Sequence, residues 1–95
     1  MTTGLRVPRR ALGIKVRRVA GDLVLGIDAD GMQLADVAKL IYESADGRNS
    51  VTDIAGIVAA EYGAEPAEVS GDVSEFLDEL AARGVVEWVT EEPVR

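Results

Sequence analysis

Apolar residues alternate with polar or small residues in the first third of the chain, at Ile14, Val16, Leu23, Leu25 and Ile27. Side chains of a strand point alternately to its two faces, so this period of two predicts a β-hairpin with its turn at residues 20–22. A second turn signal at residues 28–31 leaves residues 32–34 as a short third strand. Met32 and Leu34 would face the core, and we expect the outer edge of this strand to remain unpaired.

From residue 34 onward the apolar residues recur at intervals of three and four, which is the period of an amphipathic helix. A first helix is predicted over residues 36–45, where Asp46-Gly47 ends it. Ala35 is a poor N-cap, so the start of this helix is its least defined boundary.

Two further helices have clear boundary signals. Ser50 is a good N-cap with Asp53 three residues later, an approximate capping box, and Gly63 supplies the C-terminal stop. The third helix opens at Glu65-Pro66, with proline in the first turn, and stops at Gly84.

The remaining segments complete the predicted fold. Residues 85–89 are expected to be extended, residues 90–95 to be a frayed tail, and residues 1–12 to be a flexible basic arm. Residues 13–89 then form one domain of the α+β class, a three-stranded antiparallel sheet packed on three helices. This arrangement is typical of a winged helix-turn-helix.

The composition argues against most catalytic and metal-binding functions. The 95 residues include no cysteine and no histidine, so the chain lacks thiolate ligands, the commonest metal ligand and the usual general base near neutral pH. We therefore expect no cofactor and no bound metal. No apolar run has the length of a signal peptide or a membrane span, so the expected location is the cytoplasm, without membrane contact.

Charge is divided unevenly along the chain. Residues 1–21 carry six basic and no acidic residues, whereas the rest carries all 17 acidic residues and four basic ones, for a net charge of −7. The basic start is either a solvated arm or a surface that meets an acidic partner or the acidic body of its own domain.

No residue pattern indicates catalysis. The carboxylates Asp28 and Asp30 are best explained by a turn, and the series on the third helix by a solvated helix face. Residues 28–31 lack the later ligands and the closing glutamate of a calcium loop. No phosphate loop or activated nucleophile is recognisable, so the chain is not expected to be an enzyme.

Two binding functions remain. A DNA-binding transcriptional regulator would suit a winged helix, but the second and third helices carry acidic residues where phosphate contacts need Lys and Arg. Peptide binding fits better, because an extended peptide could add a strand to the edge at residues 31–34 and rest against the neighbouring helix. Acidic residues on that helix would favour a peptide that carries basic residues.

Three segments carry a resemblance to a known family: QLADVAKLIYESADG from Gln33, SVTDIAGIVAAEYG from Ser50 and DVSEFLDELAARGVVE from Asp72. Their order and spacing resemble the PqqD-like family, the leader-recognition domains of ribosomally made, modified peptides (RiPPs). The resemblance covers about two thirds of the chain. It implies a non-catalytic adaptor, or peptide chaperone, that presents a precursor peptide to a tailoring enzyme. That enzyme would be a radical S-adenosylmethionine maturase, or in other pathways a leader peptidase or cyclase, and the basic arm could dock it.

The resemblance also implies where the leader peptide would bind. It would add as a strand beside the third strand and rest on the third helix. The corresponding positions are Gly31, Met32, Gln33 and Leu34 on the strand, and Val69, Asp72, Val73, Glu75, Phe76 and Glu79 on the helix. The chain departs from the family pattern at two places: Ala35 stands where a capping residue is usual, and the third strand has no aromatic residue. These departures concern the assignment of groove residues more than the fold.

Overall fold

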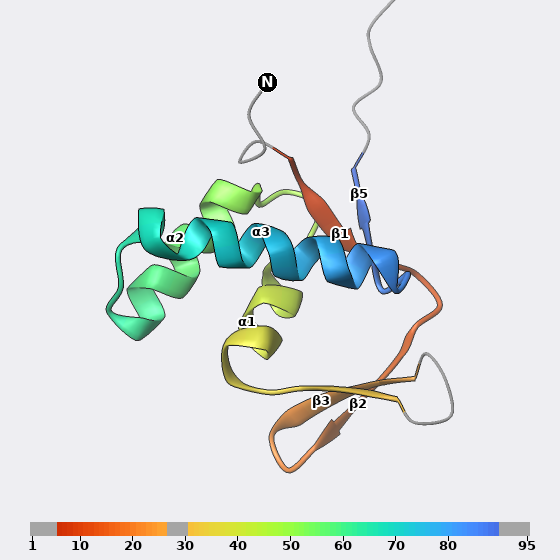
Figure 1. The fold of residues 1–95 in the computed structure, drawn as a ribbon. Helices are drawn as coiled ribbons and strands as arrows, with labels where there is room; N and C mark the ends of the chain where they lie inside the picture. Colours follow the sequence, from red (N-terminus) through yellow and green to blue (C-terminus); the bar gives the residue numbers. More distant parts are fainter. Residues whose placement is uncertain (1–5, 27–30, 90–95) are drawn as a thin grey trace, which may run out of the picture.

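The computed structural model describes residues 6–26 and 31–89, and within these ranges the chain forms five strands and three helices. In chain order they are β1 (Pro8–Arg10), β2 (Lys15–Val19), β3 (Asp22–Gly26), β4 (Met32–Leu34), α1 (Asp36–Ser44), α2 (Val51–Tyr62), α3 (Pro66–Ala82) and β5 (Val86–Trp88). The helices gather on one side of β2, β3 and β4, while β1 and β5 lie together near the C-terminal half of α3 (Figure 1). The fold is therefore of the predicted α+β class, with antiparallel sheets.

The predicted hairpin is confirmed. β2 and β3 pair antiparallel with Val19 opposite Asp22, so Ala20 and Gly21 alone form the turn. Both residues have a positive φ, 53° and 90°, which gives the backbone twist that a two-residue hairpin loop requires. β4 pairs antiparallel with the other side of β3, and the sheet order is β2–β3–β4. Most of the predicted second turn, with Ile27, Asp28 and Asp30, lies outside the described residues.

The prediction that residues 1–12 form a flexible arm is wrong for residues 6–11. β1 pairs antiparallel with β5, with Pro8 opposite Trp88 and Arg10 opposite Val86. Pro8 is fully buried, and its carbonyl accepts a hydrogen bond from the backbone N–H of Gly47 at 2.9 Å. The N-terminal segment is thus part of the folded unit, where it joins the α1–α2 connection to the C-terminal strand.

The second sheet was missed because its contacts are remote in sequence. Arg9 and Glu87, which form an ion pair across the two strands at 3.1 Å, are 78 residues apart. A three-residue strand that begins with proline has no recognisable period and lacks one backbone donor. The single three-stranded sheet of the prediction is therefore incomplete, and the extended segment expected at residues 85–89 is the partner strand β5.

The helix boundaries follow the local signals closely. α2 starts with a complete capping box between Ser50 and Asp53 and ends at Gly63, whose φ is +68°. α3 has Pro66 in its first turn, and α1 starts after Ala35 without a side-chain cap, as expected from the sequence. These features are local, so the sequence alone was sufficient to predict them.

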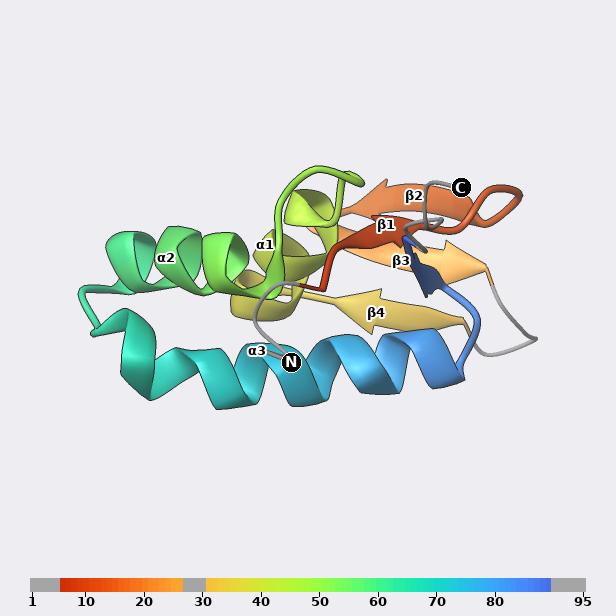
Figure 2. The same ribbon diagram turned by 90° about the horizontal axis from the view of Figure 1, so that it is seen from above.

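One core joins the helices to the three-stranded sheet. Its buried side chains come from β3 and β4 (Leu23, Leu25, Leu34), α1 (Ile41, Tyr42), α2 (Val51, Ile54, Ala55, Val58), α3 (Val73, Leu77, Leu80) and the segment before and within β5 (Val85, Val86). Seen from above, α3 runs along the whole assembly, and β4 is the strand of the three-stranded sheet nearest to it (Figure 2). This arrangement leaves the edge strand β4 on the side of the sheet that faces the longest helix, α3.

Candidate peptide-binding site

β4 is an edge strand of the three-stranded sheet. Its Met32 and Leu34 pair with Leu25 and Leu23 of β3, and within the described ranges no further strand lies on its other side. Leu34 is buried, Met32 is half-buried against the core and Gln33 is exposed. An edge of this kind presents backbone groups with which an extended peptide can form hydrogen bonds.

A steric and a polar feature fix the position of this edge. Gly31 has a φ of +76°, and a Cβ there would lie 3.3 Å from both the Leu25 carbonyl oxygen and a Val24 methyl group, so glycine is the residue that fits. The Nε2 of Gln33 donates to the Asp22 carboxylate at 2.7 Å, on the face of the sheet away from the core. β4 is therefore held in place by its neighbours on β3.

An apolar groove lies between the helices. Its volume is about 240 Å³, and its lining residues are Val37, Ala38 and Ile41 of α1, Val58 of α2, and Val69, Asp72, Val73 and Phe76 of α3. A cavity of ~150 Å³ is enough to hold benzene, so this groove can take one large aliphatic or aromatic side chain. Asp72 is the one charged residue among those that line it.

The structure brings together only some of the predicted helix residues. Val69, Asp72, Val73 and Phe76 line the groove, with Val73 buried as part of its floor. Glu75 and Glu79 are exposed and do not line it, and Glu79 forms an ion pair with Arg83 at 3.7 Å. The four strand residues Gly31, Met32, Gln33 and Leu34 belong to the β4 edge instead of the groove.

The contribution of α1 to the groove was missed. Val37, Ala38 and Ile41 belong to the apolar stripe of α1, which an amphipathic helix is expected to turn toward the core. Val37 is nevertheless 40% exposed. The signal in the sequence was an apolar stripe on α1 that is wider than the neighbouring helices can cover. How much of the stripe those helices cover is known only from the packing.

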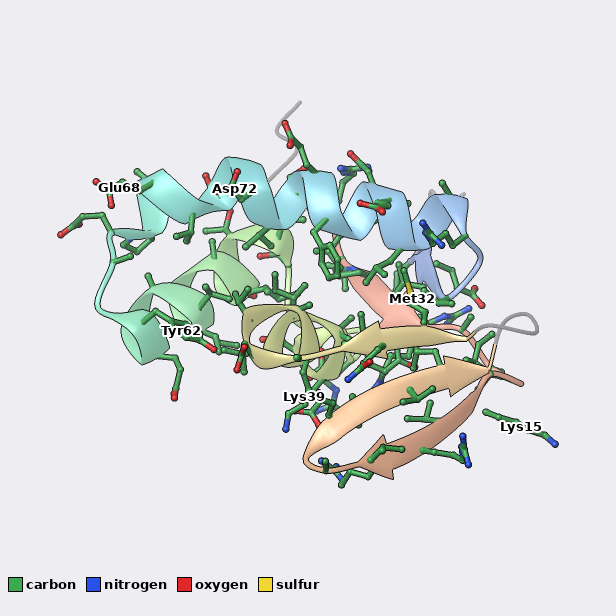
Figure 3. All side chains as sticks on the ribbon, turned by 60° about the horizontal axis from the view of Figure 1, so that its bottom comes forward. Lys15, Met32, Lys39, Tyr62, Glu68 and Asp72 are labelled. Atoms are coloured by element: carbon green, nitrogen blue, oxygen red, sulfur yellow. The ribbon has the colours of Figure 1, made fainter. Side chains whose placement is uncertain are left out.

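The surface of α3 around the groove is negative. Its exposed carboxylates are Glu68, Asp72, Glu75, Asp78 and Glu79. Arg6 lies 3.2 Å from Asp78 and Arg83 neutralises Glu79 in part. The other three carboxylates have no ion pair within the described part of the chain, and Figure 3 shows Glu68 and Asp72 on the N-terminal half of α3. A peptide with basic residues near its apolar anchor would meet complementary charge here.

Among residues 6–26 and 31–89, two titratable groups have a clearly shifted pKa, and both lie outside the groove. Burial raises the pKa of Tyr42, an effect that the Arg10 guanidinium partly offsets. Hydrogen bonds from the backbone N–H groups of Asn49 and Arg48 lower the pKa of Asp46. Neither group faces the site, and both belong to the structural connection between the N-terminal segment and the helices.

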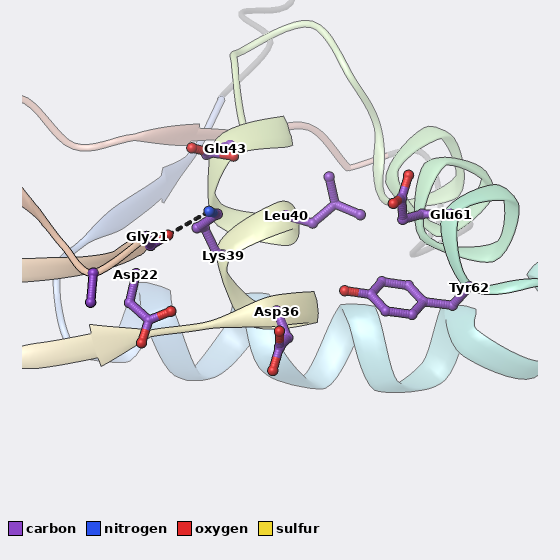
Figure 4. A pocket seen from close by; sticks show the side chains of 9 residues that line it. Gly21, Asp22, Asp36, Lys39, Leu40, Glu43, Glu61 and Tyr62 are labelled. Carbon is purple, nitrogen blue, oxygen red and sulfur yellow. Dashed lines mark hydrogen bonds between the residues drawn. The ribbon is translucent and has the colours of Figure 1, made fainter.

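A second hollow of about 420 Å³ lies where the β2–β3 turn meets α1 and the end of α2 (Figure 4). Its lining is mostly polar and includes the carboxylates Asp22, Asp36, Glu43 and Glu61. Lys39 Nζ donates to the Gly21 carbonyl at 2.6 Å and thus ties α1 to the hairpin turn. Over residues 6–26 and 31–89 no group of three or more carboxylates is arranged to hold a metal ion. Leu40 and Tyr62 are the large apolar residues that line this mostly polar hollow, and the predominantly apolar groove beside α3 is the better candidate.

Comparison with known proteins identifies the family. Residues 23–86 match the sequence model for coenzyme PQQ synthesis protein D, PqqD. The "PqqA binding protein" of Rhizobium meliloti is 30% identical over 92% of this chain and 91% of its own length. The "bifunctional coenzyme PQQ synthesis protein C/D" of Methylorubrum extorquens is 34% identical over 90% of this chain, which spans 23% of that longer protein.

A solved structure has the same fold. The NMR structure of the PqqD truncation of Methylobacterium extorquens PqqCD superposes with a TM-score of 0.72 at 32% identity, over 92% of this chain and 95% of that one. That domain is described as a functional, stand-alone RiPP recognition element. None of the helices in the described ranges has the length and apolarity needed to cross a bilayer. The resemblance seen in the sequence is confirmed, and this chain belongs to the PqqD family of coenzyme PQQ synthesis proteins.

Proposed function

We propose that this chain binds the leader of a ribosomally made precursor peptide and presents it to a modifying enzyme, without catalysing a reaction itself. The observation that carries the proposal is an edge strand, β4, that faces α3, together with the apolar and negatively rimmed groove between the helices. The names of the relatives support it, because one is a PqqA binding protein and the other a RiPP recognition element.

The geometry suits strand addition. A peptide paired with β4 would gain main-chain hydrogen bonds and place alternate side chains toward α3. One of these, aliphatic or aromatic, would enter the groove against Val69, Val73 and Phe76. A basic residue next to this anchor would lie near Asp72, so apolar and cationic positions together would define the preferred peptide.

The proposal includes the partner enzyme and the setting. The Methylorubrum relative joins C and D functions in one chain, which supports a role beside a biosynthetic enzyme. A radical S-adenosylmethionine maturase is the partner we propose first, with a leader peptidase or cyclase in other pathways, and the cytoplasm is the proposed location. The winged helix-turn-helix description of the fold belongs to the same proposal.

The structure gives no support to the DNA-binding alternative. Neither α2 nor α3 contains a single Lys or Arg, so neither helix could neutralise phosphates in a DNA groove.

The direct test is calorimetric titration of the chain with a synthetic PqqA peptide and with any short precursor peptide that is found encoded beside its gene. We expect one-to-one binding to at least one of them with a dissociation constant in the micromolar range or below, roughly −8 kcal/mol or better. Absence of binding to both peptides, together with salt-sensitive retention of duplex DNA, would contradict the proposal.

A further inference from the structure

The opposite edge of the same sheet, strand β2, has the features of a second docking surface. All five of its residues are exposed, and β2 pairs with β3 alone among the described strands. Val16 and Val19 remain 44% and 45% exposed, and Leu12 in the connection before β2 is 95% exposed. A strand whose residues are all exposed contributes little to the core of its own domain. The residues of β2 are therefore better explained by what its surface contacts.

The register of the sheet separates β2 into two faces. Val16 and Arg18 lie opposite the buried Leu25 and Leu23, on the core side of the sheet. Lys15, Arg17 and Val19 therefore point to the other side. Arg18 lies 3.6 Å from Glu43 of α1, whereas Lys15 and Arg17 have no ion pair within the described ranges.

We propose that the β2 edge binds an extended, acidic segment of a partner protein, in which acidic and aliphatic residues alternate. Paired with β2, such a segment would place its carboxylates beside Lys15 and Arg17 on one face and its aliphatic side chains beside Val16 on the other. Opposite charges at directly paired positions stabilise a strand pair, so the charge pattern of β2 selects this partner. The inference goes beyond the proposed function, because it concerns the edge that the leader would not occupy.

The charges argue against two other occupants. A second copy of β2 would bring its three cations close to the three cations of the first, which disfavours pairing. Nucleic acid would meet only this short basic strip on a chain of net charge −7, and few phosphates could be neutralised. An acidic protein strand uses both the cations and the free backbone groups of the edge.

Both edges can be occupied at once. β3 separates β2 from β4, and Figure 3 shows Lys15 on the side of the sheet remote from α3, while Met32 lies on the strand nearest that helix. A partner bound at β2 would therefore leave the β4 edge and the groove open for a peptide.

The test uses a synthetic peptide of roughly seven alternating Glu and Val residues, long enough to pair with β2. Titrated into the isotope-labelled chain, it should shift the backbone amide signals of residues 15–19. Lys15→Glu with Arg17→Glu should weaken binding roughly tenfold or more, as expected when two favourable charge pairs become repulsive. The control, Arg48→Glu with Arg83→Glu, changes the net charge equally at exposed sites away from β2 and should leave the affinity unchanged.

A second probe tests the backbone contribution. The same peptide with alternate amides N-methylated keeps its charges but loses hydrogen-bond donors, so strand addition predicts that its binding is lost. Unchanged binding of the methylated peptide, equal weakening in the control variant, or shifts centred on β4 and α3 would overturn the proposal. Self-association of the Lys15→Glu/Arg17→Glu variant with undiminished peptide binding would also overturn it, since the charges would then only protect the edge. Tighter binding of a duplex DNA of equal charge would assign the strip to nucleic acid.

The outcome is independent of leader binding. Titration of the Lys15→Glu/Arg17→Glu variant with the PqqA peptide measures the β4 site separately, and we expect its affinity to match that of the unmodified chain. Failure at β2 with intact leader binding would refute this inference alone, and the reverse result would refute the proposed function alone.

Discussion

Phe76 belongs both to the core and to the surface of the groove. It is half-buried, packs against the core cluster and lines the groove together with Val73 of the preceding turn. The apolar period of α3 predicted its inward direction, but the part of the ring that stays accessible depends on how far α1 and α2 extend beneath it. The position of Phe76 on the inner face of α3 could therefore be predicted from the sequence, but its exposure could not.

Phe76→Ala should weaken leader binding about tenfold or more, because an anchor contact of the peptide is lost. Phe76→Leu should have a smaller effect, since it keeps most of the apolar contact. Calorimetry measures both affinities, and thermal denaturation reports how much of the change is a loss of folded protein. Ile57→Ala, at an exposed α2 position outside the groove, is the control; an equal loss of affinity there would contradict the role of Phe76.

Asp46 predicts a pH dependence of stability. Its carboxylate accepts N–H hydrogen bonds from Asn49 at 2.8 Å and Arg48 at 2.9 Å, which hold its pKa below the ordinary value of 3.8. The folded state therefore binds a proton less readily than the unfolded chain, and the stability from this group is present above pH 3.8 and lost as the pH falls through the lowered pKa.

Urea denaturation at a series of pH values from neutral downward measures this dependence. Asp46→Asn cannot titrate, so its free energy of unfolding should fall less steeply below pH 3.8 than that of the unmodified chain. Parallel curves for the two proteins would show that Asp46 is not linked to folding.

At the scale of elements, the helices and strands that depend on contacts close in sequence could be predicted, and those that depend on distant contacts could not. The helices and the β2–β3 hairpin depend on caps, a proline and turn residues within a few positions, and the sequence predicted them. β1 depends on β5 and on the α1–α2 connection, through hydrogen bonds such as Arg10 N–H to the Ala45 carbonyl at 3.1 Å. No local pattern encodes such contacts, so this strand was taken for an arm.

Arg6 contributes to the attachment of this N-terminal segment to α3 and β5. Its guanidinium lies 3.9 Å from the ring centroid of Trp88 and 3.2 Å from an Asp78 oxygen. The cation–π contact is worth about 1 kcal/mol in a half-exposed setting. The buried Arg6 Nε has no hydrogen-bond partner, which offsets part of this gain.

Arg6→Ala should lower the free energy of unfolding by about 1 kcal/mol, and Arg6→Lys by less, because lysine keeps a cation near the ring. Trp88 is the single tryptophan of the chain, so its fluorescence follows both the unfolding transition and the local environment. A shift of the native emission toward longer wavelength is expected for Arg6→Ala. Unchanged stability and emission would mean that the segment is held by its backbone contacts alone.

At the scale of the whole molecule, the basic and the acidic residues lie on different parts of the surface. The basic residues of the first 21 positions are distributed over β1, β2 and Arg6, and the acidic residues are concentrated on α3 and the helix ends. Three of these basic residues form ion pairs within the domain itself: Arg6 with Asp78, Arg9 with Glu87 and Arg18 with Glu43. The sequence showed this polarity, but the fold was needed to place the cations at one edge of the sheet and the apolar groove beside the other.

The central claim is that β4 and α3 together hold a peptide in extended form. The most direct measurement is an NMR titration of the isotope-labelled chain with the PqqA peptide, followed by detection of intermolecular contacts. We predict amide shifts at Met32, Gln33 and Leu34 and on the groove side of α3, with contacts between peptide backbone protons and β4. Binding that shifts β2 or α2 and leaves residues 32–34 unperturbed would contradict the account.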